Sequence, residues 1–338
     1  MSDFVNIIVP AIKVDDLLIN CIYHSLQQTH TNYKITISID NDDNIEKLYS
    51  LANKNKIEID IIKISNVNIS TKRNLAAYKS KSDFLAFIDS DAYPVKEWLS
   101  NSLNIFKEKS VEVVTGPTGL PFPDEKYFNT LINLCKRSFF TTGRWSKRKY
   151  SKNDFFLDQV ESCNLIVKTK SFKKINGMNE KIYISEDTDF CNRINIFFGE
   201  KKMFYSGKCA IFHKDRNLRN FIVQRFSWGM YIDVDYSNLH GIDKLLIFLP
   251  LICFLVGTIC SILSFWYINF LIFLLIIIIV FCCIVSIELS KFNINFFEKI
   301  ICTFIIILTN ISYSIGNLIC LTKLQKLIGK KIYRNSKK

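Results

Sequence analysis

The chain has 338 residues, which is enough for one domain of ordinary size and an appendage. Of its residues 49% are hydrophobic, and its formal net charge is +13. A basic balance suits nucleic acid, anionic lipid or phosphate-bearing substrates. No zinc-finger spacing and no RNA-binding aromatic signature is present in the sequence, so nucleic acid is not an expected partner.

Cysteine usage bears on the cellular compartment. The 11 cysteines form no C-x-x-C pair, and they indicate neither a disulfide framework nor a zinc site. This pattern predicts a reducing environment. The first residues lack the basic region and apolar run of a signal peptide, so the domain before Lys244 is expected to stay in the cytosol.

Strands and helices alternate along the first part of the chain. Apolar runs predict strands at residues 5–10, 33–39, 57–64 and 84–88. Helical spacing follows at residues 15–28 and 45–53, and Ser70 or Thr71 is the expected cap of a helix that runs through Tyr78. Such alternation predicts βαβ units, and hence an α/β fold with a mostly parallel sheet flanked by helices.

The second part of the domain is less regular. Strands are expected at residues 111–117, 162–167 and 208–213, with a short helix at 172–178. Residues 120–158 are expected to be irregular. They include a basic run at 144–149, which suits either a solvated loop or a lid that contacts an acceptor phosphate.

The strand at residues 84–88 ends in Asp89-Ser90-Asp91. Residues two apart on an extended chain point to the same side, so both carboxylates can face one crevice. The carboxyl ends of strands are where open α/β sheets bind ligands. Two close carboxylates repel each other unless a cation offsets their charge, and hard oxygen ligands suit Mg²⁺ or Mn²⁺. The alternative is a solvated turn, which Asp and Ser also favour.

Other polar residues fall at the same predicted edge. Asp40 follows the second strand, and Arg73 and Asn74 open the helix after the third. Further along, Ser185 is a plausible cap of a helix whose first turn contains Glu186, Asp187 and Asp189. His213 ends a late strand. A lone histidine is usually structural, although histidine is also a common metal ligand.

The order of these motifs resembles that of family 2 glycosyltransferases, which have the GT-A fold. The resemblance covers about residues 4–231. It rests on five stretches and two single residues, namely Ile7-Ile8-Val9-Pro10, Asp40, Lys72-Arg73-Asn74-Leu75, Phe87-Ile88-Asp89-Ser90-Asp91, Ile175-Asn176-Gly177-Met178-Asn179-Glu180, Ser185-Glu186-Asp187-Thr188-Asp189-Phe190 and His213.

The resemblance implies a role for each matched residue. Asp40 and Arg73 would bind the nucleotide. Asp89 and Asp91 would form the DXD motif, which contacts the ribose and a diphosphate bound through Mn²⁺ or Mg²⁺. Asp187 would be the catalytic base of an inverting transfer, with Glu186 beside it to place the acceptor. His213 would be an added metal or diphosphate contact.

One stretch departs from the family pattern. Processive polysaccharide synthases of this family carry Q-x-x-R-W. Here Gln224 and Trp228 match, but Ser227 stands where arginine is expected and Arg225 is displaced by two positions. This departure favours transfer of one or a few sugars. The same segment also suits an amphipathic helix at a membrane surface.

The C-terminal part is expected to lie in a membrane. No charged residue lies between Lys244 and Glu288, which is enough for two spans joined near residues 264–269. A third uncharged run between Lys299 and Lys323 contains polar residues and either faces protein or lies partly in the interface. The expected divisions are a catalytic domain at 1–214, an interfacial helix and linker at 215–243, two or three membrane helices at 244–322, and a basic tail at 323–338.

Together these features predict a membrane-anchored glycosyltransferase with a cytoplasmic catalytic domain. Its donor would be a UDP- or GDP-linked sugar, and its acceptor a lipid-linked or membrane-presented glycan of a cell-surface polysaccharide or glycolipid. Two alternatives stay open. One is a polyprenyl-phosphate glycosyltransferase, whose lipid phosphate the basic run would contact. The other is a catalytically silent membrane scaffold that binds nucleotide-sugars.

Overall fold

The computed structural model describes residues 3–41, 43–233 and 245–324. The chain divides into two compact units. The first contains residues 1–123 and 147–214, and the second contains residues 124–146 and 215–338. Residues 124–146, which lie within the range expected for the catalytic domain, therefore belong to the second unit.

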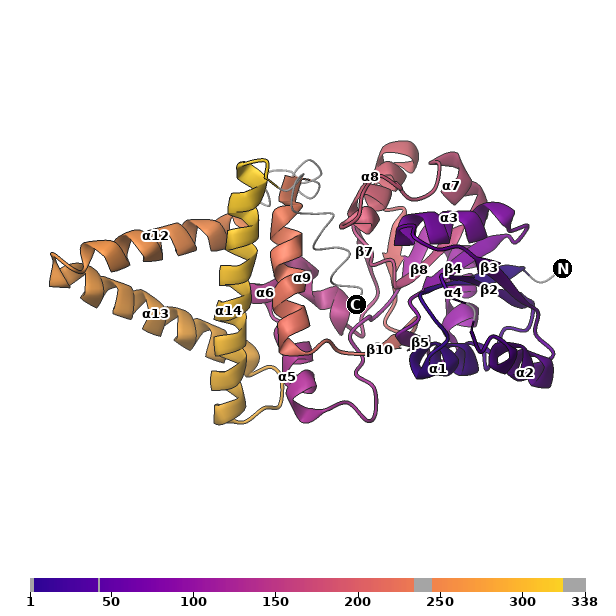
Figure 1. Ribbon diagram of the computed structural model, residues 1–338, viewed down its shortest axis with the longest axis horizontal. Coiled ribbons are helices and arrows are strands. Elements are labelled where there is room, and N and C mark those ends of the chain that lie inside the picture. Colours follow the sequence, from indigo (N-terminus) through magenta and orange to yellow (C-terminus); the bar gives the residue numbers. More distant parts are fainter. Residues whose placement is uncertain (1–2, 42, 234–244, 325–338) are drawn as a thin grey trace. The chain divides into compact units, whose positions relative to one another are not determined.

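The first unit is built on an eight-stranded sheet (Figure 1). Strands β3, β2, β1 and β4 are parallel neighbours, β8 runs antiparallel between β4 and β6, and β9 and β7 complete the far side. The prediction of a mostly parallel α/β sheet is confirmed. The strand bounds are β1 Val5–Ala11, β2 Tyr33–Ile39, β3 Ile59–Lys63, β4 Phe84–Ile88, β6 Val113–Thr115, β7 Phe155–Leu157, β8 Asn164–Lys168 and β9 Met203–Tyr205.

Helices cover both faces of this sheet (Figure 1). Alternate residues of β1 point to opposite faces, so Val5, Ile7 and Val9 join one core cluster and Ile8 joins the other. The first cluster includes side chains of α1 (Asp16–Ser25), α2 (Glu46–Asn55) and α4 (Trp98–Glu108). The second includes α3 (Ile69–Lys79), α7 (Thr169–Lys174) and α8 (Glu186–Phe198).

Two expectations about local structure were wrong. Asn68, not Ser70 or Thr71, caps α3, because its side chain accepts the Thr71 N–H at 2.8 Å. Residues 120–158 are not irregular. They form α5 (Tyr127–Lys136), α6 (Phe139–Thr142), a 3₁₀ helix (Gly143–Lys149) and β7. The helical period of α5 is visible in its buried residues Leu131, Ile132 and Cys135, whose contacts lie in the second unit and not in the sheet.

In the part of the second unit that the structure describes, α5 and α6 are accompanied by four longer helices. These are α9 (Leu218–Met230), α12 (Leu249–Leu263), α13 (Ile268–Leu289) and α14 (Phe296–Leu321). Among the described residues, α13 and α14 are long and apolar enough to cross a membrane. α12, with 15 residues, is shorter. The expected turn near residues 264–269 lies between α12 and α13, where Phe265, Trp266 and Tyr267 are exposed.

α14 differs from α13 in its surroundings. Only 6% of the most apolar stretch of α13 is buried, against 44% of that of α14. The polar residues Ser312, Ser314 and Asn317 of α14 are buried, which confirms that this run faces protein.

Close packing of α9 on α14 explains that burial. A Cβ atom at Gly229 of α9 would lie 2.1 Å from the carbonyl oxygen of Tyr313, and one at Gly316 of α14 would lie 2.2 Å from that of Phe226. The two backbones therefore touch through glycines, as small residues permit at helix interfaces in membranes. Arg225, the displaced arginine of the sequence pattern, is buried on the same face of α9, with its guanidinium 4.5 Å from the Tyr313 ring centroid.

Gly316→Ala should therefore destabilise the second unit by about 1–3 kcal/mol, since the added methyl group forces the two helices apart. Thermal unfolding of the detergent-solubilised protein measures this. Gly257→Ala in α12 is the matched control, because the nearest atom to its new Cβ is 4.0 Å away. That variant should be unchanged, or more stable by up to about 1 kcal/mol through helix propensity. Equal effects of the two substitutions would contradict the packing argument.

Candidate active site

Asp89 and Asp91 lie just beyond the carboxyl end of β4, as the sequence predicts. The Ala92 N–H donates to the Asp89 carbonyl oxygen at 3.1 Å, which turns the chain into β5 (Ala92–Pro94). β5 pairs antiparallel with β10 (Ile211–His213), and this pairing sets His213 opposite Ala92. The side chains of Asp89 and Asp91 remain 27% and 39% exposed, so both can meet a ligand.

Arg73 connects this strand end to helix α8. Its guanidinium is 1% exposed and donates to Asp89 Oδ1 at 2.6 Å and to Glu186 Oε1 at 3.0 Å. Burial alone would lower the pKa of Arg73, but the two carboxylates outweigh it and raise that pKa. Arg73 therefore stays charged, and it brings together Asp89 and Glu186, which are 97 positions apart in the sequence.

Asp40 is held by a different cation. Lys72 Nζ lies 2.5 Å from Asp40 Oδ2 and also donates to the Ala11 carbonyl oxygen at 2.5 Å. Lys72 is part of the matched motif, but no role was predicted for it. Its role could have been predicted from its position one residue before Arg73, because consecutive residues near a helix N-terminus can face two neighbouring strand ends.

Asn74 positions the loop that precedes α8. Its side chain donates to the Met178 carbonyl oxygen and accepts the Met178 N–H, each at 2.8 Å. The loop must turn at Gly177, whose φ is +66°, and a Cβ there would lie 2.6 Å from Asn74 Oδ1. The same amide donates to Glu180 at 2.8 Å. These contacts give the predicted 175–180 motif a structural role, since they fix where α8 begins.

The first turn of α8 carries the three predicted acids. Ser185 occupies the cap position with φ +64°, but its side chain makes no capping hydrogen bond, contrary to expectation. Glu186 is bound to Arg73, and Asp189 pairs with Arg193 at 2.6 Å. Asp187 is half-buried, and its Oδ1 accepts the Thr188 N–H at 2.9 Å.

The residues near Asp89 have the donor set of a cation site. His213 Nδ1 lies 2.9 Å from the Lys214 carbonyl oxygen and donates to it, because a carbonyl only accepts. In the neutral ring Nε2 then carries the lone pair, and it lies 3.6 Å from Asp91 Oδ1. Two acceptors that face each other suit a cation between them. Ligand atoms of Asp89, His213 and Cys163 also lie within 4.8 Å of one another. These residues fit a divalent ion.

Cys163 was not predicted at this site, and nothing in its local sequence signals it. Its place follows from sheet register, because antiparallel pairing of Ile88 with Asn164 carries Cys163 next to Asp89. Burial, and then the charges of Glu161 and Asp89, raise the pKa of the Cys163 thiol.

The basic run at 144–149 is only partly solvated. Lys149 Nζ lies 2.6 Å from Glu161 Oε1, and Arg148 lies 3.6 Å from the same oxygen. Thr118 also donates to Glu161. Burial alone would raise the pKa of Glu161, but the charges of Lys149 and Arg148 and these hydrogen bonds hold it well below its ordinary value. Arg148 and Lys149 thus serve an internal ion pair, which differs from both expectations for the run.

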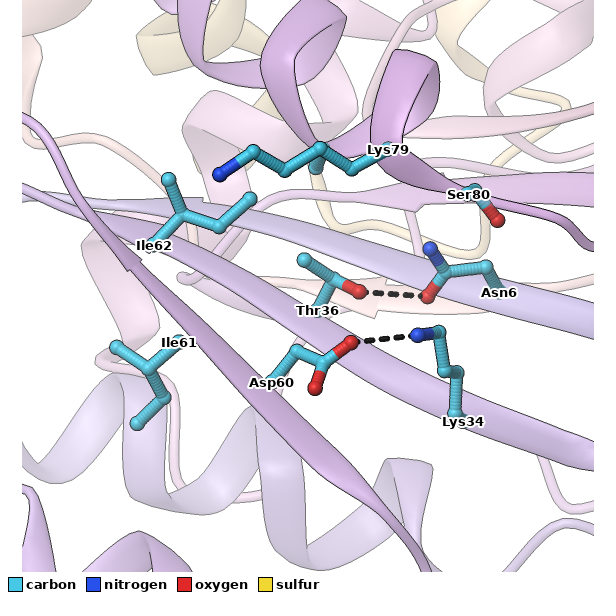
Figure 2. A pocket seen from close by; sticks show the side chains of 9 residues that line it. Asn6, Lys34, Thr36, Asp60, Ile61, Ile62, Lys79 and Ser80 are labelled. Atoms are coloured by element: carbon cyan, nitrogen blue, oxygen red, sulfur yellow. Dashed lines mark hydrogen bonds and ion pairs between the residues drawn. The ribbon is translucent and has the colours of Figure 1, made fainter.

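A separate small pocket lies at the opposite end of the strands. Figure 2 shows it between the start of the sheet and the end of α3, with Asn6 bonded to Thr36 and Lys34 paired with Asp60. Its volume is about 230 Å³. None of the predicted site residues lines it.

Known proteins resemble this chain in sequence family and in fold. A model of glycosyl transferase family 2 matches residues 6–176. Residues 1–349 of S. aureus TarS have a similar structure, with a TM-score of 0.50 and 15% identity, over 71% of this chain and 68% of that one. The same protein in complex with UDP-GlcNAc gives a TM-score of 0.50 at 14% identity, over 71% and 69%.

A longer structure of S. aureus TarS matches over 79% of this chain and 44% of that one, with a TM-score of 0.50 and 15% identity. At such identities the likeness supports the fold alone, and it confirms the predicted GT-A-like architecture. No curated protein matches the chain by sequence.

The Glu161 ion pair makes a pH-dependent prediction. Glu161→Gln should lower the free energy of unfolding at pH 7 by about 1–3 kcal/mol, because it leaves the partly buried Lys149 and Arg148 without their counter-charge. A depressed pKa contributes stability above the ordinary Glu value of about 4.3 and loses it as the pH falls further. The difference between wild type and variant should therefore shrink below about pH 4.

Denaturant unfolding between pH 7 and 3 measures this difference. Glu58→Gln is the control, since the Glu58 side chain beside Lys34 is 67% exposed, and it should change stability by less than about 1 kcal/mol. A Glu161→Gln effect that is constant with pH would contradict the assignment.

Proposed function

The chain belongs to glycosyl transferase family 2, and from this premise we propose that it transfers a sugar, with inversion, from a UDP- or GDP-linked donor to a membrane-associated glycan or lipid-linked acceptor. One observation carries the proposal. Arg73 binds Asp89 of the strand end and Glu186 of α8, so that the residues suited to the donor and those suited to the acceptor share one rigid support.

The donor half of the site comprises the strand ends and the start of α3. Asp40, held by Lys72, and Asp89, held by Arg73, are available to the nucleoside. Asp91, Asp89 and His213 would hold Mn²⁺ or Mg²⁺, which, when bound, offsets the charge that develops on the leaving diphosphate. Arg73 and Lys72 keep the carboxylates oriented before the donor arrives.

The acceptor half is the first turn of α8. We assign Asp187 as the general base that takes the proton of the acceptor hydroxyl. The hydroxyl oxygen then forms a bond to the anomeric carbon as the bond from that carbon to the diphosphate oxygen breaks, and the electron pair leaves with the diphosphate. Attack opposite the leaving group inverts the configuration and needs no covalent nucleophile. Glu186 keeps α8 in place through Arg73.

Membrane attachment would come from the second unit. α13 and α14 are long and apolar enough to cross a membrane. We infer a catalytic domain on the cytoplasmic side that comprises most of residues 1–214, with a lipid-linked or membrane-presented acceptor of a cell-surface polysaccharide or glycolipid. Of the expected basic tail at 323–338, residues 325–338 lie outside the described residues. Residues 234–243 of the expected interfacial helix and linker at 215–243 also lie outside them.

The two alternatives have less support. A polyprenyl-phosphate glycosyltransferase was suggested by the basic run, but Arg148 and Lys149 pair with Glu161. A silent scaffold would have no need of the half-buried Asp187 beside the Arg73 bridge.

Calorimetric titration of UDP, GDP and their sugar conjugates, with and without Mn²⁺, tests the donor site. UDP-GlcNAc is the first conjugate to try, because S. aureus TarS was solved in complex with it. We expect metal-dependent binding of one nucleotide, and its loss in Asp91→Asn. Asp60→Asn is the control, since Asp60 pairs with Lys34 at the opposite end of the sheet. Absence of binding by folded protein under every condition would refute the transferase proposal.

Asp187→Asn should leave nucleotide binding intact and slow sugar transfer by about 10²–10⁴-fold, as expected for loss of a general base. Incorporation of labelled sugar into membranes of the source cells measures transfer. Asp189→Asn removes an acid from the same helical turn that pairs with Arg193, and should retain most of the activity. Unchanged transfer by Asp187→Asn would show that another group is the base.

A further inference from the structure

We propose that Cys163 is a ligand of the cation at the Asp89 site, and that its sulfur makes the site prefer transition-metal ions over Mg²⁺. The inference rests on the proposed function only for the use of that ion in sugar transfer. Of the two ions proposed for the site, Mn²⁺ and Mg²⁺, the sulfur ligand favours Mn²⁺.

The backbone holds Cys163 firmly in this position. Its neighbour Asn164 is fully buried and pairs with Ile88, the last residue of β4. The Asn164 side chain accepts from Trp98 Nε1 at 2.8 Å and donates to the Cys209 carbonyl oxygen at 2.9 Å, while its own carbonyl accepts from Thr115 at 2.5 Å. Residue 163 therefore cannot move away from Asp89 without breaking these bonds.

The three donor atoms come from three separate elements and still converge. One ligand atom each of Asp89, Cys163 and His213 lies within 4.8 Å of the other two. A metal about 2.0–2.3 Å from nitrogen, oxygen and sulfur donors holds them roughly 3–4 Å apart, so small side-chain rotations would close the set. His213 is already oriented by its bond to the Lys214 carbonyl, which is how ligating histidines are usually fixed.

Sulfur changes which ion this set favours. Mg²⁺ demands near-octahedral oxygen coordination and retains water. Thiolate and imidazole favour later first-row metals, and affinity rises from Mn²⁺ to Co²⁺ for a given set of ligands. A site of two carboxylates, one imidazole and one thiolate should therefore bind Co²⁺ more tightly than Mn²⁺, and Mn²⁺ more tightly than Mg²⁺.

A purely structural role is the competing explanation, since cysteine often packs as a small hydrophobe. Cys21 provides the comparison. It is fully buried, and its Sγ faces the Asp89 carbonyl oxygen at 3.6 Å, not the cluster of ligand atoms. Cys163 is only half-buried, and it is the cysteine that joins the cluster.

Co²⁺ titration of the full-length protein in detergent, without nucleotide, is the test. Bound thiolate gives a charge-transfer absorption in the near ultraviolet, which carboxylate and imidazole do not. We expect this band in wild type and in Cys21→Ala, and its loss in Cys163→Ser and Cys163→Ala. The Co²⁺ dissociation constant should rise at least tenfold in both Cys163 variants, about the cost of losing even a supporting residue of a metal site.

The ratio of Mn²⁺ to Mg²⁺ affinity is measured on the same proteins and should fall in Cys163→Ser. Near-ultraviolet circular dichroism of each variant verifies that it is folded. A band that persists in folded Cys163→Ser, or Co²⁺ binding with no thiolate band in wild type, would overturn the inference while leaving the transferase proposal intact. Conversely, a thiolate band together with failure of every nucleotide to bind would retain this site and reject the proposed function.

Discussion

The guanidinium of Arg73 is the interaction on which the site depends. Burying a cation costs several kcal/mol unless its charge is matched, and here two carboxylates match it. Each carboxylate in turn belongs to a different part of the fold, Asp89 to the end of β4 and Glu186 to the start of α8. The energetic need to pair Arg73 therefore sets the distance between the end of β4 and the start of α8 before any ligand binds.

The sequence predicted this site in outline because its chemistry is local. Apolar runs that end in acids identify strand ends in a parallel sheet, so Asp40, Asp89 and Asp91 could be placed without a structure. The contacts between these groups could not be placed in this way. Three contacts depend on strand register and helix rotation, which sequence periodicity does not encode. They are the pairing of Lys72 with Asp40, the hydrogen bonds of Asn74 to Met178 and the approach of Cys163 to Asp89.

Residues 124–146 show a second limit of sequence reasoning. They lie within the expected catalytic domain, yet α5 and α6 belong to the second unit, where Leu131, Ile132 and Cys135 are buried with residues of α9, α13 and α14. The helical period of α5 was missed, because residues 120–158 were expected to be irregular. The period alone would not have identified the partner of α5, since a helix of the same pattern would suit either core. Likewise, the need for glycine at positions 229 and 316 could not be predicted without the packing of α9 on α14.

A structure determined with UDP and Mn²⁺, with anomalous scattering recorded at the manganese edge, would locate both the ion and the nucleotide. We expect one manganese peak coordinated by Asp91, with Asp89, His213 and Cys163 around it and the diphosphate bound to the ion on the side of α8. A manganese peak or nucleotide elsewhere, for example in the pocket at the opposite end of the strands, would show that the donor does not bind at the end of β4.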